Sequence, residues 1–180
     1  MVKVKIVNVV ATASVNQPMD FEVLRKCKEI FHDSDVYGGR VAYFKPESLQ
    51  GRVSIFLSGK MISVGTKSEK QAQTELHMAK QFLLDKGFIK DIELYPCTQN
   101  LVVTADFEQS LNLEELTTRT RAIYEPEQFP GAILRITQPF KTSVLIFASG
   151  KTVITGLKSQ SEIDPTINRL QQIIEINLFN

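Results

Sequence analysis

Residues 55–68 read IFLSGKMISVGTKS, and residues 146–159 read IFASGKTVITGLKS. The two stretches are separated by a constant shift of 91 positions, since Phe56 returns as Phe147 (147 − 56 = 91). Both contain an apolar strand, a Ser-Gly turn and two lysines. This pattern indicates a tandem duplication, and the repeated residues suit a binding surface with approximate two-fold symmetry better than an enzyme.

The duplication extends outward from this block. Residues 7–13 (VNVVATA) match residues 99–105 (QNLVVTA) at a shift of 92 (99 − 7 = 92). We therefore predict a first repeat over residues 1–90 and a second over residues 91–180. The connecting segment 87–96 is too short and too apolar for a flexible linker, so the repeats should form one continuous domain with a shared sheet.

Each repeat has the same predicted order of elements: a β-branched strand, an amphipathic helix, short strands and a long helix. The first strands are expected at 2–13 and 98–106, and apolar residues at helical spacing predict the next helices over 21–31 and 113–123. The short strands are expected at 40–44, 53–57, 132–137 and 143–148. Capping boxes at Ser68 and Ser159 predict the long helices. Their apolar stripes are Ala72, Leu76, Ala79 and Leu83, and Ile163, Ile167, Leu170 and Ile174.

The strands are apolar on both faces. Asn8, Val10 and Thr12 point to one side of the first strand, while the apolar residues between them point to the other. Four helices can cover only one face of such a sheet, so the second face either packs under loops or an oligomer mate, or binds a partner. The minor groove of AT-rich DNA fits such a face, since its floor displays hydrogen-bond acceptors and its walls are apolar sugar edges.

Composition limits the function further. The 180 residues carry a net charge of +1, and 43% of them are hydrophobic, enough for a real core. A nearly neutral chain does not bind nucleic acid by electrostatics alone. We expect an intracellular, soluble protein without a membrane segment, metal or cofactor. Cys27 and Cys97 are expected to be free thiols, and His32 and His77 have no catalytic partner in sequence reach, so we expect no enzyme.

The chain closely resembles the TATA-binding protein family over essentially its whole length, and looks more archaeal than eukaryotic. The resemblance is carried by YEPEQFPG at 124–131, LIFASGK at 145–151 and TGLKS at 155–159. It implies an α+β fold: a pseudo-two-fold saddle, with a curved antiparallel sheet of about ten strands and four helices on the convex face. It also implies a general transcription initiation factor that binds and bends TATA-box promoter DNA through the minor groove.

The expected partners are double-stranded promoter DNA, a transcription factor B type protein and the RNA polymerase pre-initiation complex, with weak self-association in the absence of DNA. The protein should be intracellular and DNA-associated, in the cytoplasm or nucleoid if archaeal and in the nucleus if eukaryotic.

The resemblance also assigns roles to individual residues. Those expected to intercalate between base steps are Phe56, Phe129, Phe147 and Tyr37. Those expected to line the minor groove are Asn8, Val10, Thr12, Ile62, Val64, Asn100, Val102, Thr104, Leu145, Val153 and Thr155. The residues expected to bind DNA phosphates are Lys60, Lys67, Arg135, Lys151 and Lys158. Those expected to bind the protein partner are Glu125 and Glu127.

The first repeat departs from the family pattern. Tyr37 stands where the family has phenylalanine, Val64 where the second repeat has Thr155, and Tyr43 where a counterpart of Arg135 is expected. Its loop 32–37, which includes Asp35, has lost the family pattern. A diverged paralogue, acting mainly as a protein adaptor or regulator with weak and poorly specific DNA binding, is therefore the alternative function.

Overall fold

The computed structural model describes residues 2–32 and 37–178, without the side chains of residues 32, 37 and 176–178. These residues form nine strands, four α-helices and two short 3₁₀ helices. They divide into two compact units, which we call the N-terminal unit (Asn8–Gln99) and the C-terminal unit (Met1–Val7 with Asn100–Asn180). The α+β class with an antiparallel sheet is confirmed.

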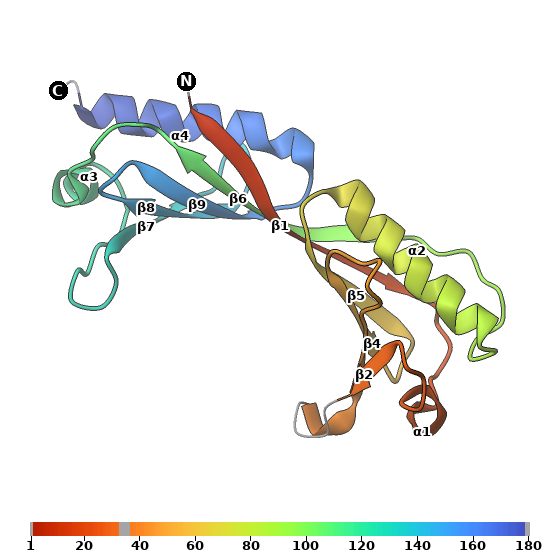
Figure 1. Ribbon diagram of the computed structural model, residues 1–180. Helices are drawn as coiled ribbons and strands as arrows, with labels where there is room; N and C mark the ends of the chain where they lie inside the picture. Colours follow the sequence, from red (N-terminus) through yellow and green to blue (C-terminus); the bar gives the residue numbers. More distant parts are fainter. Residues whose placement is uncertain (1, 33–36, 179–180) are drawn as a thin grey trace. The chain divides into compact units, whose positions relative to one another are not determined.

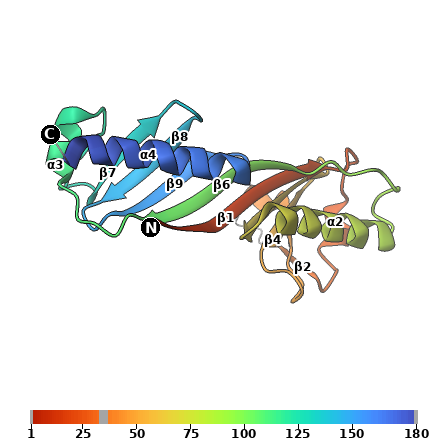
Figure 2. The same ribbon diagram turned by 90° about the horizontal axis from the view of Figure 1, so that it is seen from above.

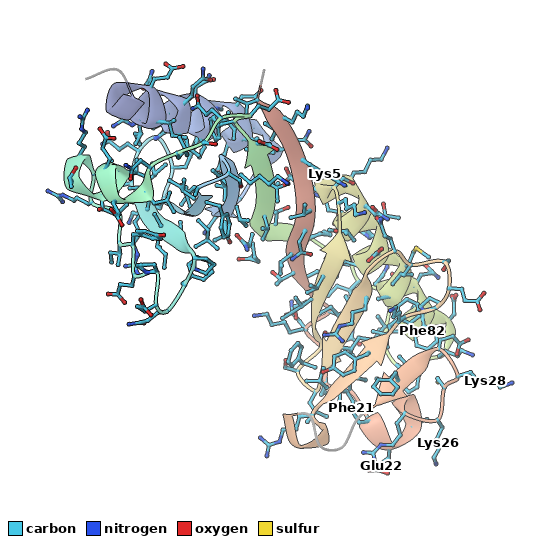
Figure 3. All side chains as sticks on the ribbon, turned by 60° about the vertical axis from the view of Figure 1, so that its left-hand side comes forward. Lys5, Phe21, Glu22, Lys26, Lys28 and Phe82 are labelled. Carbon is cyan, nitrogen blue, oxygen red and sulfur yellow. The ribbon has the colours of Figure 1, made fainter. Side chains whose placement is uncertain are left out.

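The N-terminal unit holds the strand order β2-β3-β4-β5-β1. Its elements are β1 (Lys3–Ser14, beginning in the other unit), α1 (Phe21–Leu24), β2 (Ile30–His32), η1 (Tyr37–Gly39), β3 (Val41–Phe44), β4 (Arg52–Phe56), β5 (Lys60–Thr66) and α2 (Glu69–Asp85). Figure 1 shows α2 along one side of these strands. Phe82 of α2, labelled in Figure 3, packs on Phe44 of β3 with ring centroids 4.9 Å apart.

The C-terminal unit holds the order β6-β9-β8-β7. Its elements are β6 (Cys97–Asp106, beginning in the other unit), α3 (Leu113–Arg119), β7 (Gly131–Ile136), β8 (Thr142–Phe147), β9 (Lys151–Leu157), η2 (Gln160–Glu162) and α4 (Ile163–Leu178). Seen from above in Figure 2, α4 lies across β6, β9 and β8.

The two long helices begin where the sequence predicts. The Ser68 hydroxyl accepts a hydrogen bond from Gln71 N at 3.2 Å, and Ser159 caps the 3₁₀ turn that precedes α4. Both predicted apolar stripes are confirmed as core. Those of α2 and α4 are at most 6% exposed: Ala72, Leu76, Ala79, Leu83, Ile163, Ile167, Leu170 and Ile174.

The two shorter helices end earlier than predicted. After Leu24 the α-helical bonding of α1 gives way to a tighter turn, because Lys26 N donates to Val23 O and Cys27 N donates to Leu24 O, both three residues back and both at 3.1 Å. Phe31 then lies in β2, opposite Tyr43. Likewise Ile123 lies beyond α3 and forms an isolated bridge with Ile133, where a tenth strand would stand.

No helix within the described ranges is both long and apolar enough to cross a membrane. Cys27 and Cys97 are free thiols, as predicted.

Candidate nucleic-acid interface

Each unit has one sheet face covered by helices and one face left open. On β1, Val9, Ala11 and Ala13 are buried, while Val10 and Thr12 alternate with them and are partly exposed. The same alternation runs through β6, β8 and β9. The open face therefore carries the side chains that the sequence assigned to a partner.

Two asparagines on the open faces are fixed by bulges in the sheet. Asn8 Oδ1 accepts from Gly65 N at 2.9 Å, and Asn100 Oδ1 accepts from Gly156 N at 2.7 Å. Both glycines have positive φ, 101° and 104°, next to register shifts in the β1–β5 and β6–β9 pairings. A backbone N–H can only donate, so each asparagine must turn its oxygen to the glycine. Each NH₂ group is thereby kept as a donor for other acceptors.

The two asparagines differ in their second neighbour. Asn100 Nδ2 donates to Thr155 Oγ1 at 3.1 Å. In the N-terminal unit Val64 occupies the place of Thr155 and offers no hydroxyl. Within the described ranges, the Asn8 NH₂ group donates to no protein acceptor.

Rows of register partners run across each open face. One row of the N-terminal unit is Thr12, Ile62, Ser54 and Tyr43, and the corresponding row of the C-terminal unit is Thr104, Val153, Leu145 and Ile133. These rows contain five of the eleven residues predicted to line a groove: Thr12, Ile62, Thr104, Leu145 and Val153. Both are apolar or hydroxyl-bearing and carry no charge.

An aromatic pair closes one end of the C-terminal open face. The rings of Phe129 and Phe147 meet edge to face, with centroids 5.8 Å apart and an interplanar angle of 60°. Gly131 lies beneath them, and a Cβ added there would be 2.8 Å from Phe129 Cε1 and 3.2 Å from Phe147 Cε1. The pair therefore needs glycine at this position.

Among the residues whose side chains are described, the N-terminal unit has no counterpart of this ring pair. Val41 pairs with Phe56 as Gly131 pairs with Phe147, so the position two residues earlier is Gly39 where the C-terminal unit has Phe129. Phe56 is partly exposed on the open face. The Tyr37 side chain and Asp35 lie outside the described residues.

The five predicted phosphate contacts, Lys60, Lys67, Arg135, Lys151 and Lys158, are all exposed. None of them forms an ion pair with a carboxylate of the described part of the chain. Glu125 and Glu127 are exposed too, on a turn held by Gln128 N and Phe129 N donating to Glu125 O, each at 2.9 Å.

Where β1 begins, the C-terminal unit has a hollow of about 590 Å³ lined by Lys3, Lys5, Thr104, Phe147, Lys151 and Val153. Lys3 pairs with Glu108, which raises the pKa of the lysine and lowers the pKa of the carboxyl. The charge of Lys3 is thereby partly offset, whereas Lys151 at the same hollow has no carboxylate partner among the described residues.

Comparisons with known proteins agree with this geometry. The family described as "Transcription factor TFIID (or TATA-binding protein, TBP)" matches residues 3–83 and 96–176. The TATA-box-binding protein of Cenarchaeum symbiosum (strain A) is 38% identical over 160 residues, covering 88% of this chain and 87% of the relative. The chain belongs to the TATA-binding protein family.

Further archaeal relatives extend the match. The TATA-box-binding protein of Methanococcus aeolicus is 31% identical over 183 residues, covering 96% of this chain and 94% of that protein. The solved structure of the Methanococcus jannaschii TBP superposes with a TM-score of 0.84 at 31% identity, covering 97% of this chain and 99% of that one. The predicted family, its archaeal character and the duplicated family pattern are confirmed.

Strand register corrects one prediction made for this family member. Tyr43 lies opposite Ser54 as Ile133 lies opposite Leu145, so Tyr43 corresponds to Ile133 and not to Arg135. The error arose because the segment from the first-strand asparagine to this position is two residues longer in the N-terminal unit (43 − 8 = 35 against 133 − 100 = 33), so the shift of 92 that holds for the first strands pairs Tyr43 with Arg135. The counterpart of Arg135 is Lys45, which is exposed, so the basic position is kept.

Three residues on the N-terminal open face were missed by sequence reasoning. Phe31 stacks on Tyr43 with centroids 6.2 Å apart, and the guanidinium of Arg52 lies 4.6 Å from the centroid of the Tyr43 ring. Phe31 was hidden by its assignment to a helix, and Arg52 has Ser143 as its repeat partner. The β2–β3 and β3–β4 registers together are needed to place the three side chains beside one another.

Proposed function

We propose that this protein is a general transcription initiation factor that binds TATA-box promoter DNA through the minor groove and bends it. The observation that carries the proposal is the pair of asparagine amides, each held by a bulge glycine so that N–H donors remain on a face lined by apolar and hydroxyl-bearing side chains. In the minor groove, A·T and T·A pairs offer only acceptors, adenine N3 and thymine O2. Donors fixed among apolar residues match that floor.

Bending would come from the aromatic side chains at the ends of the open faces. Phe129 and Phe147 form a preassembled pair, and such apolar wedges unstack a base step and kink the duplex. Phe56 is the wedge of the N-terminal unit. The two repeats would act on DNA as one continuous domain, inside the cell and without catalytic chemistry.

Affinity would depend on the five exposed cations. If each neutralises one phosphate, the logarithm of the affinity should fall with the logarithm of the salt concentration at a slope of roughly −4 to −5. The exposed carboxylates of Glu125 and Glu127 would bind a transcription factor B type protein. Through that partner the protein would join the RNA polymerase pre-initiation complex.

A second candidate function is supported by the N-terminal unit. Gly39 stands where the other unit has Phe129, and Val64 stands where it has Thr155. A protein with one weak half would serve mainly as an adaptor that holds its protein partner and binds DNA with little specificity.

One experiment separates the two functions. Binding is measured on a TATA duplex and on a scrambled duplex of the same composition, with fluorophores at both DNA ends to report bending. A general factor binds the TATA duplex much more tightly and brings its ends together. Weak and equal binding to both duplexes, without bending, would favour the adaptor.

A further inference from the structure

The outer edges of the two open faces carry different chemistry at the same register positions. In the N-terminal unit these positions hold Phe31 and Tyr43, with Arg52 on the neighbouring strand. In the C-terminal unit the corresponding residues are Ile123, Ile133 and Ser143. The N-terminal unit thus has two aromatic residues and an arginine where the C-terminal unit has two isoleucines and a serine.

The N-terminal set forms a layered cluster. Tyr43 is only 8% exposed and is covered by Phe31, which is itself 63% exposed. The Arg52 guanidinium also lies against the Tyr43 ring, and no carboxylate of the described residues pairs with it. A guanidinium held over a ring keeps its charge and its in-plane N–H donors, with less side-chain freedom to lose on binding.

We infer that the cluster of Phe31, Tyr43 and Arg52 binds the deoxyribose-phosphate backbone of DNA at the outer edge of the N-terminal open face. Arg52 donates to a phosphate, while the exposed ring of Phe31 covers the apolar edge of a sugar. This inference rests on the proposed function, because the cluster continues the row Thr12, Ile62, Ser54 and Tyr43 that faces the groove.

Charge favours DNA over a protein partner at this edge. Lys45 follows Phe44, which pairs with Val53, so it stands beside Arg52 on the adjacent strand. Both residues are exposed. Two neighbouring cations next to an exposed ring match a polyanion whose sugars are apolar. A second copy of this chain would place the same cations against each other.

The inference gives the N-terminal unit a contact with the DNA backbone that the C-terminal residues at the same register do not offer. The C-terminal unit would hold a base step with the rings of Phe129 and Phe147, whereas the N-terminal unit would hold the backbone with the ring of Phe31 and the guanidinium of Arg52.

The test exchanges the cluster residues for their counterparts. Arg52→Ser and Tyr43→Ile reproduce the C-terminal residues, and Phe31→Ala removes the exposed ring. The control is Val23→Ala, which shortens an exposed apolar side chain of the same unit on α1, outside the strands. Each variant is measured for TATA affinity at several salt concentrations and by hydroxyl-radical footprinting. Thermal unfolding establishes that it folds.

We expect Arg52→Ser to reduce the magnitude of the salt slope by about 1, as the loss of one phosphate contact requires. Phe31→Ala should weaken binding by roughly 5-fold and shorten the protected region at one end only, since a lost aromatic contact to DNA costs on the order of 1 kcal/mol. Val23→Ala should change neither measurement.

An unchanged salt slope for Arg52→Ser together with an unchanged footprint for Phe31→Ala would overturn the inference, although the wild-type protein could still prefer TATA. If the wild type binds both duplexes alike, the proposed specific function fails, but the slope and footprint still decide whether the cluster contacts the backbone. Loss of self-association or of protein-partner binding, with DNA binding intact, would assign the cluster to a protein contact instead.

Discussion

Replacing Asn100 by aspartate tests the proposed contact of its amide with base acceptors in the minor groove, while it keeps the shape of the side chain. One oxygen of the new carboxylate can still accept from Gly156 N, whose bond to Asn100 is 2.7 Å long. The Thr155 hydroxyl, which accepts from Asn100 Nδ2 at 3.1 Å, can rotate and donate to the other oxygen. We therefore expect the free energy of unfolding to change by less than about 1 kcal/mol.

DNA binding should respond very differently. Under the proposed function, the substitution removes a donor to the base acceptors and puts a negatively charged acceptor in its place. An unpaired group of this kind in a dry interface costs about 2–3 kcal/mol, which corresponds to a Kd about 30- to 150-fold higher. The assay is fluorescence anisotropy with a labelled TATA duplex at one fixed salt concentration.

A scrambled duplex separates base reading from charge repulsion. Repulsion between the new carboxylate and phosphates would weaken binding to both duplexes by the same factor. Loss of a base contact should weaken binding to TATA more, so the ratio of the two affinities should fall. If the Asn100→Asp variant binds TATA within about threefold of wild type, the amide does not read the groove floor and the reasoning from the bulge geometry is refuted.

Three further predictions concern wedge, stability and partner. Gly131→Ala places a Cβ 2.8 Å from Phe129 Cε1, so the ring pair must shift. The variant should bend DNA less, as measured by energy transfer between fluorophores at the two DNA ends, and should still bind a transcription factor B type protein. An unchanged bend would contradict the role of the ring pair. Glu75 is 2% exposed, and its carboxylate accepts from Gln50 N at 3.0 Å and from Gly51 N at 2.9 Å. Glu75→Ala should therefore lower the free energy of unfolding, measured by urea titration, by about 2–4 kcal/mol. A loss below about 1 kcal/mol would show that water replaces the carboxylate. Glu125→Arg should spare TATA binding and abolish partner recruitment in a gel-shift assay; loss of DNA binding would remove Glu125 from its docking role.

The buried half of the fold could be predicted from the sequence because burial leaves a periodic signature. The stripes of α2 and α4 and the alternation of β1 follow helical and strand spacing, and each was found where expected. The short helix α1 could not be predicted to its end. Leu24 and Phe31 are seven positions apart (31 − 24 = 7), which fits a helix, yet Phe31 belongs to a strand whose partner, Tyr43, lies 12 residues further along (43 − 31 = 12). The spacing of apolar residues within one segment cannot reveal a strand pairing with a residue outside that segment.

The candidate site was predictable where the repeats agree and was wrongly matched where their lengths differ. The asparagines and Phe147 lie in blocks that keep one shift, so comparing the halves located them. The segment between the first-strand asparagine and β3 is two residues longer in the N-terminal unit, and sequence comparison therefore matched Tyr43 to the wrong residue. Hydrogen-bond register settles such a case because each pleat position has one partner. That register also showed Gly39 at the position of Phe129.

The repeats differ in the core as well as on the open faces. Ile55 and Ile146 are identical and 0% exposed, but Ser63 corresponds to Ile154 at the same shift of 91 (154 − 63 = 91), and both are also 0% exposed. Burial in both units therefore does not by itself keep a side chain unchanged. On the open faces the asparagine and the bulge glycine are kept in both units, and the bond between them fixes the amide in each. We therefore expect a ligand that uses this amide in both repeats, and the Asn100→Asp measurement tests that expectation.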